Sequence, residues 1–225
     1  MANRIPFAPE EWYHCFNRSI DKRSVFSNAR EYMRFVQLLY ICNSAKQIHR
    51  SDLYNQSTEQ ILQLQRGKPL VAIGAFCLMP NHFHLLLKER DDGGISTFMQ
   101  KIGIAYAMYF NIKNKRTGNI FMRPFRSRHV SEDSYFQYVV NYIHCNPAEL
   151  YEHGWKQGTV QNIALLEKKL LAYPYSSFGA HQDKKHAYRN ILDAEVFAVA
   201  NPFPVRKMLS EAAEYYEEVH VKMLS

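Results

Sequence analysis

The sequence predicts a protein of mixed class, α/β or α+β, in which helices lie on a small β-sheet. Segments with the two-residue period of a strand alternate along the chain with segments of helical period. Hydrophobic residues make up 47% of the composition, which is enough for an ordinary buried core. The length of 225 residues suits one large domain, or one domain with an appendage.

Four segments are predicted to be strands. In residues 11–18, Trp12, His14 and Phe16 alternate with residues of the opposite face. Residues 70–79 are apolar enough for a buried strand, and Pro80-Asn81 separates them from a second extended segment at 82–88. The fourth strand, 120–130, contains Pro124, which restricts it to an edge or a bulge.

Helical periods and end signals predict the helices. Asn28 is a good N-cap for the first of them, and Pro147 ends the one that begins near Ser131. Gly118 is expected to close the helix before it, and residues 173–180 are expected to form a loop. The predicted helices are 28–44, 58–65, 95–113, 131–145, 163–171 and 205–220. We divide the chain into a main domain, 1–182, and a C-terminal tail with a helix, 183–225.

Charge and composition narrow the classes of function. Lys and Arg number 28 against 21 Asp and Glu, which favours a polyanionic partner such as nucleic acid. No stretch approaches the ~20 apolar residues of a membrane span, and the first eleven residues lack an apolar leader. The four cysteines form no C-x-x-C pair. We therefore expect a cytoplasmic protein with reduced thiols and no membrane partner.

Two histidines form the first candidate site. His82 and His84 stand at i and i+2 of a predicted strand, so both imidazoles face the same side while Phe83 faces the other. Two imidazoles on one face can hold a divalent cation and leave positions open for substrate oxygens. The simpler alternative is a pair of hydrogen-bonded core histidines.

The helix 131–145 and the residue after it carry the second candidate. Tyr142 and Asn146 are i and i+4, so the phenol and the amide lie side by side if the helix keeps its last turn before Pro147. Tyr138 lies one turn earlier on the same face and is the rival nucleophile. Ordinary packing of a tyrosine stripe is the alternative.

A cluster of basic residues is the third candidate. Cations and two aromatic residues, Phe121 and Phe125, are interleaved over a short stretch, a pattern that suits phosphates and unpaired bases. A solvated helix end followed by a charged edge strand explains it equally well. The cations are Lys113, Lys115, Arg116, Arg123, Arg126 and Arg128.

Together these motifs resemble a known family. Residues 78–87, LMPNHFHLLL, resemble the HUH motif of the single-tyrosine transposases, and residues 142–147, YIHCNP, resemble the catalytic-helix signature of their REP-associated branch. Tyr13-His14, Asn17-Arg18, residues 98–100, Tyr106, residues 109–111, Tyr173 and Ser176-Ser177 match as well. The resemblance covers most of the chain.

The resemblance implies an α+β fold, with a ferredoxin-like antiparallel sheet flanked by helices and a C-terminal helical appendage. It implies that His82, His84 and Asn146 bind Mg²⁺ or Mn²⁺ and that Tyr142 is the nucleophile. The activity it implies is nicking and joining of single-stranded or hairpin DNA through a 5′-phosphotyrosine. A monomer and a homodimer both stay open.

The chain departs from the family pattern in three places, at residues 45–67, at Arg123-Pro124 and at residues 148–150. Any of the three can change which DNA is bound. Two other functions stay open. One is a protein that binds DNA hairpins without cleaving them, and the other is a zinc hydrolase that adds His129 or His144 to the histidine pair.

Overall fold

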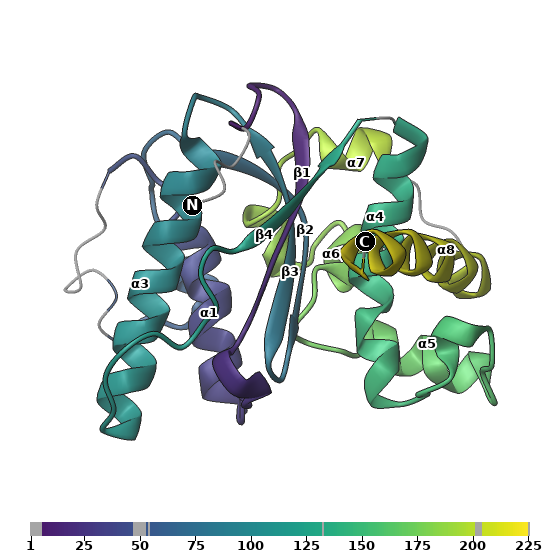
Figure 1. Ribbon diagram of the computed structural model, residues 1–225. Coiled ribbons are helices and arrows are strands. Elements are labelled where there is room, and N and C mark those ends of the chain that lie inside the picture. The colour runs from purple at the N-terminus through teal and green to yellow at the C-terminus, as the bar shows by residue number, and fades with distance from the viewer. Residues whose placement is uncertain (1–5, 47–52, 54, 132, 201–203, 225) are drawn as a thin grey trace.

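A four-stranded antiparallel sheet forms the centre of the molecule (Figure 1). The structure is a computed structural model that describes residues 6–46, 53, 55–131, 133–200 and 204–224. The strands lie in the order β2-β3-β1-β4. Their bounds are β1 (Trp12–Arg18), β2 (Val71–Met79), β3 (His82–Glu89) and β4 (Arg126–Val130).

The helices follow most of the predicted bounds. All six expected helices are present, and two short ones, α6 and α7, were not predicted. They are α1 (Ala29–Ile41), α2 (Thr58–Ile61), α3 (Gly94–Asn114), α4 (Asp133–Cys145), α5 (Ile163–Leu171), α6 (Phe178–Gln182), α7 (Val196–Val199) and α8 (Val205–Leu224). The chain order of strands and helices around the sheet, β1-α1-β2-β3-α3-β4, is the ferredoxin-like arrangement, so the predicted α+β class is confirmed.

Three local predictions need correction. The fourth strand begins at Arg126 instead of Ile120, since Pro124 has no N–H to donate to a ladder, and it lies at the sheet edge as expected. Lys115, with φ of 51°, caps α3 three residues before Gly118. The predicted loop 173–180 runs into α6. Of the unassigned segment 45–67, residues 47–52 and 54 lie outside the described residues.

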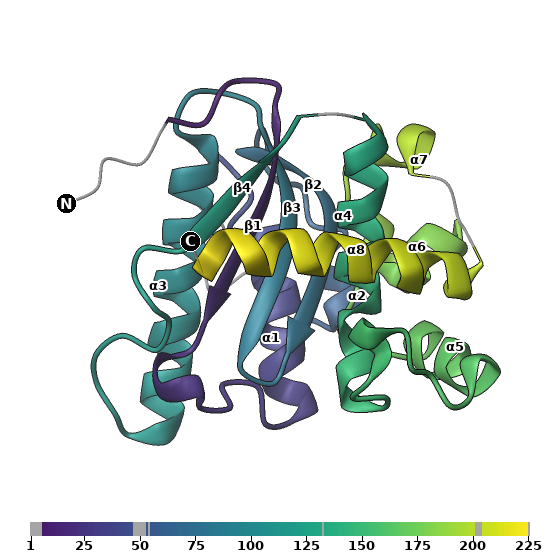
Figure 2. The same cartoon turned by 45° about the vertical axis from the view of Figure 1, so that its right-hand side comes forward.

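The alternation of β3 divides its side chains between two cores. Phe83, Leu85 and Leu87 point to the face covered by α1 and α3. Leu86 points to the opposite face, where α4 and α8 pack against each other (Figure 2). Since His82 and His84 share the parity of Leu86, the sheet presents both imidazoles to the α4 layer.

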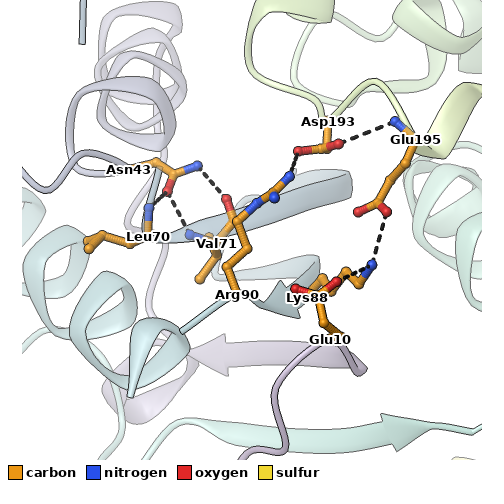
Figure 3. Close-up of polar contacts among 8 residues, drawn as sticks. All are labelled: Glu10, Asn43, Leu70, Val71, Lys88, Arg90, Asp193 and Glu195. Carbon is orange, nitrogen blue, oxygen red and sulfur yellow. Dashed lines mark hydrogen bonds and ion pairs between the residues drawn. The ribbon is translucent and has the colours of Figure 1, made fainter. Parts of the chain in front are cut away.

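The tail after residue 182 packs on the rest of the molecule. Tyr188 and Ile191 are buried in the core beneath α1. Figure 3 shows the polar contacts that hold the next residues: Arg90 pairs with Asp193, and Lys88 Nζ lies 2.9 Å from Glu195 Oε2. The backbone N–H of Asp193 also donates to Ile73 on β2, at 2.9 Å. These tail residues pack directly against the sheet and α1. The domain boundary at residue 182 stays a prediction.

The four cysteines are buried and form no disulfide: Cys15, Cys42, Cys77 and Cys145. Within the described part of the chain, no helix has the length and apolarity needed to span a membrane.

One buried histidine makes the stability depend on pH. Burial lowers the pKa of His181 to about 4, although its Nε2–H donates to the Gly74 carbonyl at 3.1 Å. The unfolded chain takes up a proton near pH 6.5 and the folded chain does not, so the contribution of His181 to stability is lost as pH falls from about 6.5 towards 4. The His181→Phe variant should therefore show a shallower slope of unfolding free energy with pH, by up to about 1.4 kcal/mol per pH unit.

Urea unfolding at a series of pH values measures this slope. The matched control is His153→Gln, because His153 is exposed. Parallel slopes for His181→Phe and the unmodified protein in that pH window would contradict the prediction.

Candidate active site

A cleft of about 860 Å³ opens on the α4 side of the sheet. It lies between the ends of β1 and β3, the end of α4 and the middle of α8. The residues that line it include His82, His84, Tyr142, Asn146, Arg18 and Lys156. The two motifs predicted from the sequence, about sixty residues apart, therefore meet in one place.

Each histidine of β3 uses its Nδ1 atom in a hydrogen bond. His82 Nδ1 lies 2.7 Å from Asn81 Oδ1, and His84 Nδ1 lies 2.9 Å from His14 Nε2. The ring centroids of His82 and His84 are 5.1 Å apart. These two contacts do not involve the Nε2 atoms, so Nε2 is the nitrogen of each ring that could bind a metal ion.

Burial keeps both imidazoles neutral. It lowers the pKa of His82 to about 4 and that of His84 well below 6.5, and the positive charges of Arg18 and Lys156 act in the same direction. At neutral pH each ring thus carries a lone pair that can be donated to a cation.

Tyr142 and Asn146 meet these histidines from the end of α4. The Tyr142 ring lies 5.4 Å from the His84 ring, centroid to centroid, and is 6% exposed. Asn146 Nδ2 donates to the Tyr142 carbonyl at 2.9 Å. The Asn146 side chain also acts on both neighbours, since, against the larger effect of burial, it acts to raise the pKa of His82 and to lower that of the Tyr142 phenol. The predicted side-by-side arrangement holds although Pro147 follows directly, because Asn146 continues from α4 into a short 3-10 helix, η3 (Asn146–Leu150).

The environment of Tyr142 opposes its ionisation. Burial raises the pKa of the phenol far above 10, and the hydrogen bond from Asn146 acts in the opposite direction. Tyr138, the rival, is half-buried beside Tyr135 and is not one of the described residues that line the cleft. The cleft geometry therefore favours Tyr142 over Tyr138.

The histidines suggested for a zinc hydrolase lie elsewhere. His144 Nε2 is 2.9 Å from Ser177 Oγ, and His129 Nε2 is 2.9 Å from Glu11 Oε2. Across the described ranges no three His, Cys, Asp or Glu side chains group as a metal site. A cation in the cleft would instead have two imidazoles and the oxygen of Asn146, a donor set that fits Mg²⁺ or Mn²⁺ and also accepts Zn²⁺.

The family is decided by comparison of the sequence with family models. Residues 32–146, just over half of the chain, match the model described as "Transposase IS200 like". The chain belongs to this transposase family. The match ends at Asn146, so it includes His82, His84 and Tyr142 and leaves out both β1 and α8.

One solved structure is similar to this IS200-like family member. It is described as a REP-associated tyrosine transposase bound to a REP hairpin, and it shows 15% sequence identity and a TM-score of 0.48. The match covers 90% of this chain and 98% of that one. No curated protein shows significant similarity to the chain.

The predicted basic cluster of this transposase-family chain is divided between the two faces of the sheet. Among its six cations only Arg126 lines the cleft. Lys113 pairs with Glu31 at 2.7 Å and Arg116 lies over Phe110, both in the α1 and α3 layer, and Lys115 ends α3. Arg123 lines a neighbouring hollow of about 470 Å³. Arg128 lies over the rings of Tyr135 and Tyr215.

Three residues of the site were given no role from the sequence, although His14 and Arg18 lie in segments that match the family. Arg18 and Lys156 bring positive charge to the cleft, and Lys156 is held by an ion pair with Glu149. His14 is buried behind His84. The alternation of β1 placed His14 on the correct face, and the ferredoxin-like sheet implied by the resemblance puts β1 beside β3. The register that brings His14 to His84 was not predicted. Lys156 carries no motif that marks it.

The positions of Arg18 and Arg126 in the cleft predict where DNA phosphates bind. Arg18→Ala and Arg126→Ala should each flatten the slope of log affinity against log salt for a DNA hairpin with a single-stranded end by about 0.7, because each removes one phosphate contact. Affinity should fall similarly for different sequences, since phosphate contacts do not read bases. Fluorescence anisotropy at several salt concentrations measures both effects.

The control is Arg30→Ala, an exposed cation on α1, the helix that covers the other face of the sheet. If Arg30→Ala lowered the slope as much as Arg126→Ala, the cleft would not be the path of the DNA.

Proposed function

We propose that this protein nicks and rejoins single-stranded DNA, with Tyr142 as nucleophile and with His82, His84 and Asn146 as ligands of a divalent cation, Mg²⁺ or Mn²⁺. The observation that supports it most is the meeting of these four side chains in one cleft. Membership of a transposase family supports the DNA-processing part of the proposal.

The chemistry is a transesterification. The Tyr142 oxygen attacks a DNA phosphorus, a new O–P bond forms, and the bond from phosphorus to the 3′ oxygen breaks. The phenol loses its proton to solvent in the cleft, and the departing oxygen gains one to become a 3′-hydroxyl. The products are a 5′-phosphotyrosine and a free 3′ end, and attack by a 3′-hydroxyl on the phosphotyrosine reverses the step.

The surrounding residues have separate parts in this step. Asn146 orients the phenol, whose raised pKa keeps it protonated until substrate arrives. Arg18 and Lys156 supply positive charge for the phosphate that enters the cleft. A bound divalent cation supplies a Lewis acid that offsets negative charge on the phosphate in the transition state.

The side chains of the cleft support single-stranded DNA as the substrate. The cleft combines cations with the rings of Phe16 and Tyr216, a combination that suits unpaired bases and their backbone. The proposal of a hairpin next to the single strand rests on the resemblance of the motifs to the REP-associated branch. A protein that binds such hairpins without cleaving them would bind the DNA and form no covalent adduct.

Formation of an adduct tests the nucleophile. With Mn²⁺ and a single strand next to a hairpin, labelled downstream of the cut, the protein should retain the label on a denaturing gel, because Tyr142 is joined to the 5′ phosphate of the downstream fragment. Tyr142→Phe should abolish this adduct, because it lacks the attacking oxygen and keeps the ring. Tyr138→Phe is the matched control on the same helix and should leave most of the adduct.

An adduct that persists in Tyr142→Phe would show that another residue attacks. Binding without any adduct in the unmodified protein would favour the non-cleaving alternative.

Substitution of the histidines tests the metal. His82→Ala and His84→Ala should each slow cleavage by on the order of 100-fold or more, because each removes a metal ligand. Hairpin affinity should stay within about threefold, since the proposed phosphate contacts come from other side chains. Circular dichroism should show folded protein in both variants. Equal loss of folding and of binding would instead support the core-histidine interpretation.

A further inference from the structure

We propose that His14 and Tyr215 are positioning residues of the active site, which hold the ring proton of His84 on Nδ1 and so leave its Nε2 lone pair for the cation. The inference rests on the proposed function, because it assumes that His84 is a metal ligand. Both residues lie outside the segment that matches the family model.

Three buried side chains form a continuous chain of hydrogen bonds. Tyr215 Oη lies 2.7 Å from His14 Nδ1, and His14 Nε2 lies 2.9 Å from His84 Nδ1. His14 and Tyr215 are each 1% exposed, and His84 is 6% exposed. Each of these contacts joins separate parts of the chain, because the residues lie on β1, α8 and β3.

This series of hydrogen bonds allows only two arrangements of protons when both histidine rings are neutral. In the first, His84 Nδ1–H donates to His14 Nε2, and His14 Nδ1–H donates to the Tyr215 oxygen. In the second, the Tyr215 hydroxyl donates to His14 Nδ1, His14 Nε2–H donates to His84 Nδ1, and the remaining proton of His84 occupies Nε2. A cation can bind His84 Nε2 only in the first arrangement, since the second places a proton on that atom.

The acceptor role of the Tyr215 oxygen stabilises the first arrangement. Without it, His14 Nδ1–H would be a buried donor with its hydrogen bond unmade, and moving the His14 proton to Nε2 would leave an unprotonated acceptor at Nδ1 instead, which we expect to cost less. That move requires His84 to carry its own proton on Nε2, the atom proposed to bind the cation. The Tyr215 hydroxyl therefore acts on the metal ligand through His14, without reaching the cleft chemistry itself.

Packing holds the same three rings in place. The ring centroids of His14 and His84 are 5.1 Å apart in a stacked arrangement, and the Phe16 ring lies 5.6 Å from His84 and 5.0 Å from His14. In Figures 1 and 2 α8 lies against α4, and the ring centroid of Tyr215 is 5.0 Å from that of the nucleophile Tyr142. Helix α8 thus contributes a polar group to the support of the site as well as apolar cover.

The first experiment observes the proton directly and needs no metal. Long-range ¹H–¹⁵N spectra of the metal-free protein distinguish histidine tautomers, and the His84→Gln variant identifies the signals of His84. His84 should carry its proton on Nδ1, and Tyr215→Phe should move it to Nε2. His84 protonated on Nε2 in the unmodified protein, or unchanged in Tyr215→Phe, would overturn the proposal.

The second experiment measures Mn²⁺ affinity by electron paramagnetic resonance. Tyr215→Phe and His14→Phe should each weaken binding roughly 10–100-fold, the usual effect of losing a partner of a metal-ligating histidine. His14→Gln should bind closer to the unmodified protein, because the amide oxygen can take the position of Nε2 and accept the proton of His84. Equal loss in His14→Gln and His14→Phe would contradict the proton arrangement.

Tyr106→Phe is the matched control for the loss of a buried hydroxyl. Tyr106 Oη donates to the Val25 carbonyl at 2.7 Å, in the core on the other side of the sheet. It should lower the thermal midpoint and leave Mn²⁺ affinity unchanged. If Tyr215→Phe did the same, its role would be structural and the proposal would be wrong. No Mn²⁺ binding in the unmodified protein would refute the proposed metal site, and the tautomer spectra would still report on the hydrogen-bond chain.

Discussion

The pleat of β3 is the constraint on which the rest of the site depends. Because successive side chains of a strand face opposite sides, Phe83, Leu85 and Leu87 can fill one core only if His82 and His84 face the other. A shift of one residue in the pairing of β3 would put both imidazoles under α1 and α3. The apolar residues that fix the register of the strand therefore also fix the position of the two proposed metal ligands.

That constraint explains which parts could be predicted. Local patterns predicted parts of the site correctly. The alternation of His82 and His84, after an apolar run, predicted the face of the sheet on which they lie, and the spacing of Tyr142 and Asn146 predicted that these two residues are neighbours. The pairing of β1 with β3 is not local. The contact of His14 with His84 depends on the register that pairs His14 with Leu86 and Phe16 with His84, and a single sequence does not contain that register.

The basic cluster also shows that closeness in sequence does not predict closeness in the fold. Its six cations are close in sequence, but they extend from the end of α3 over a loop to β4, and the sheet separates α3 from the cleft. Arg126 reaches the cleft, whereas Lys113 neutralises Glu31, which is buried and would be costly to leave unpaired. The cations that do surround the histidines, Arg18 and Lys156, come from segments where the sequence shows no cluster.

Burial has two opposite effects on the chemistry of the site. It keeps His82 and His84 neutral and able to bind a cation, but it also raises the pKa of Tyr142 and leaves that ring 6% exposed. In the proposed reaction a phosphate would reach the phenol through the cleft that Tyr142 lines, while α8 packs on α4 and places Tyr215 beside the Tyr142 ring. Helix α8 thus completes the hydrogen-bond series behind His84 and also limits access to Tyr142, the proposed nucleophile.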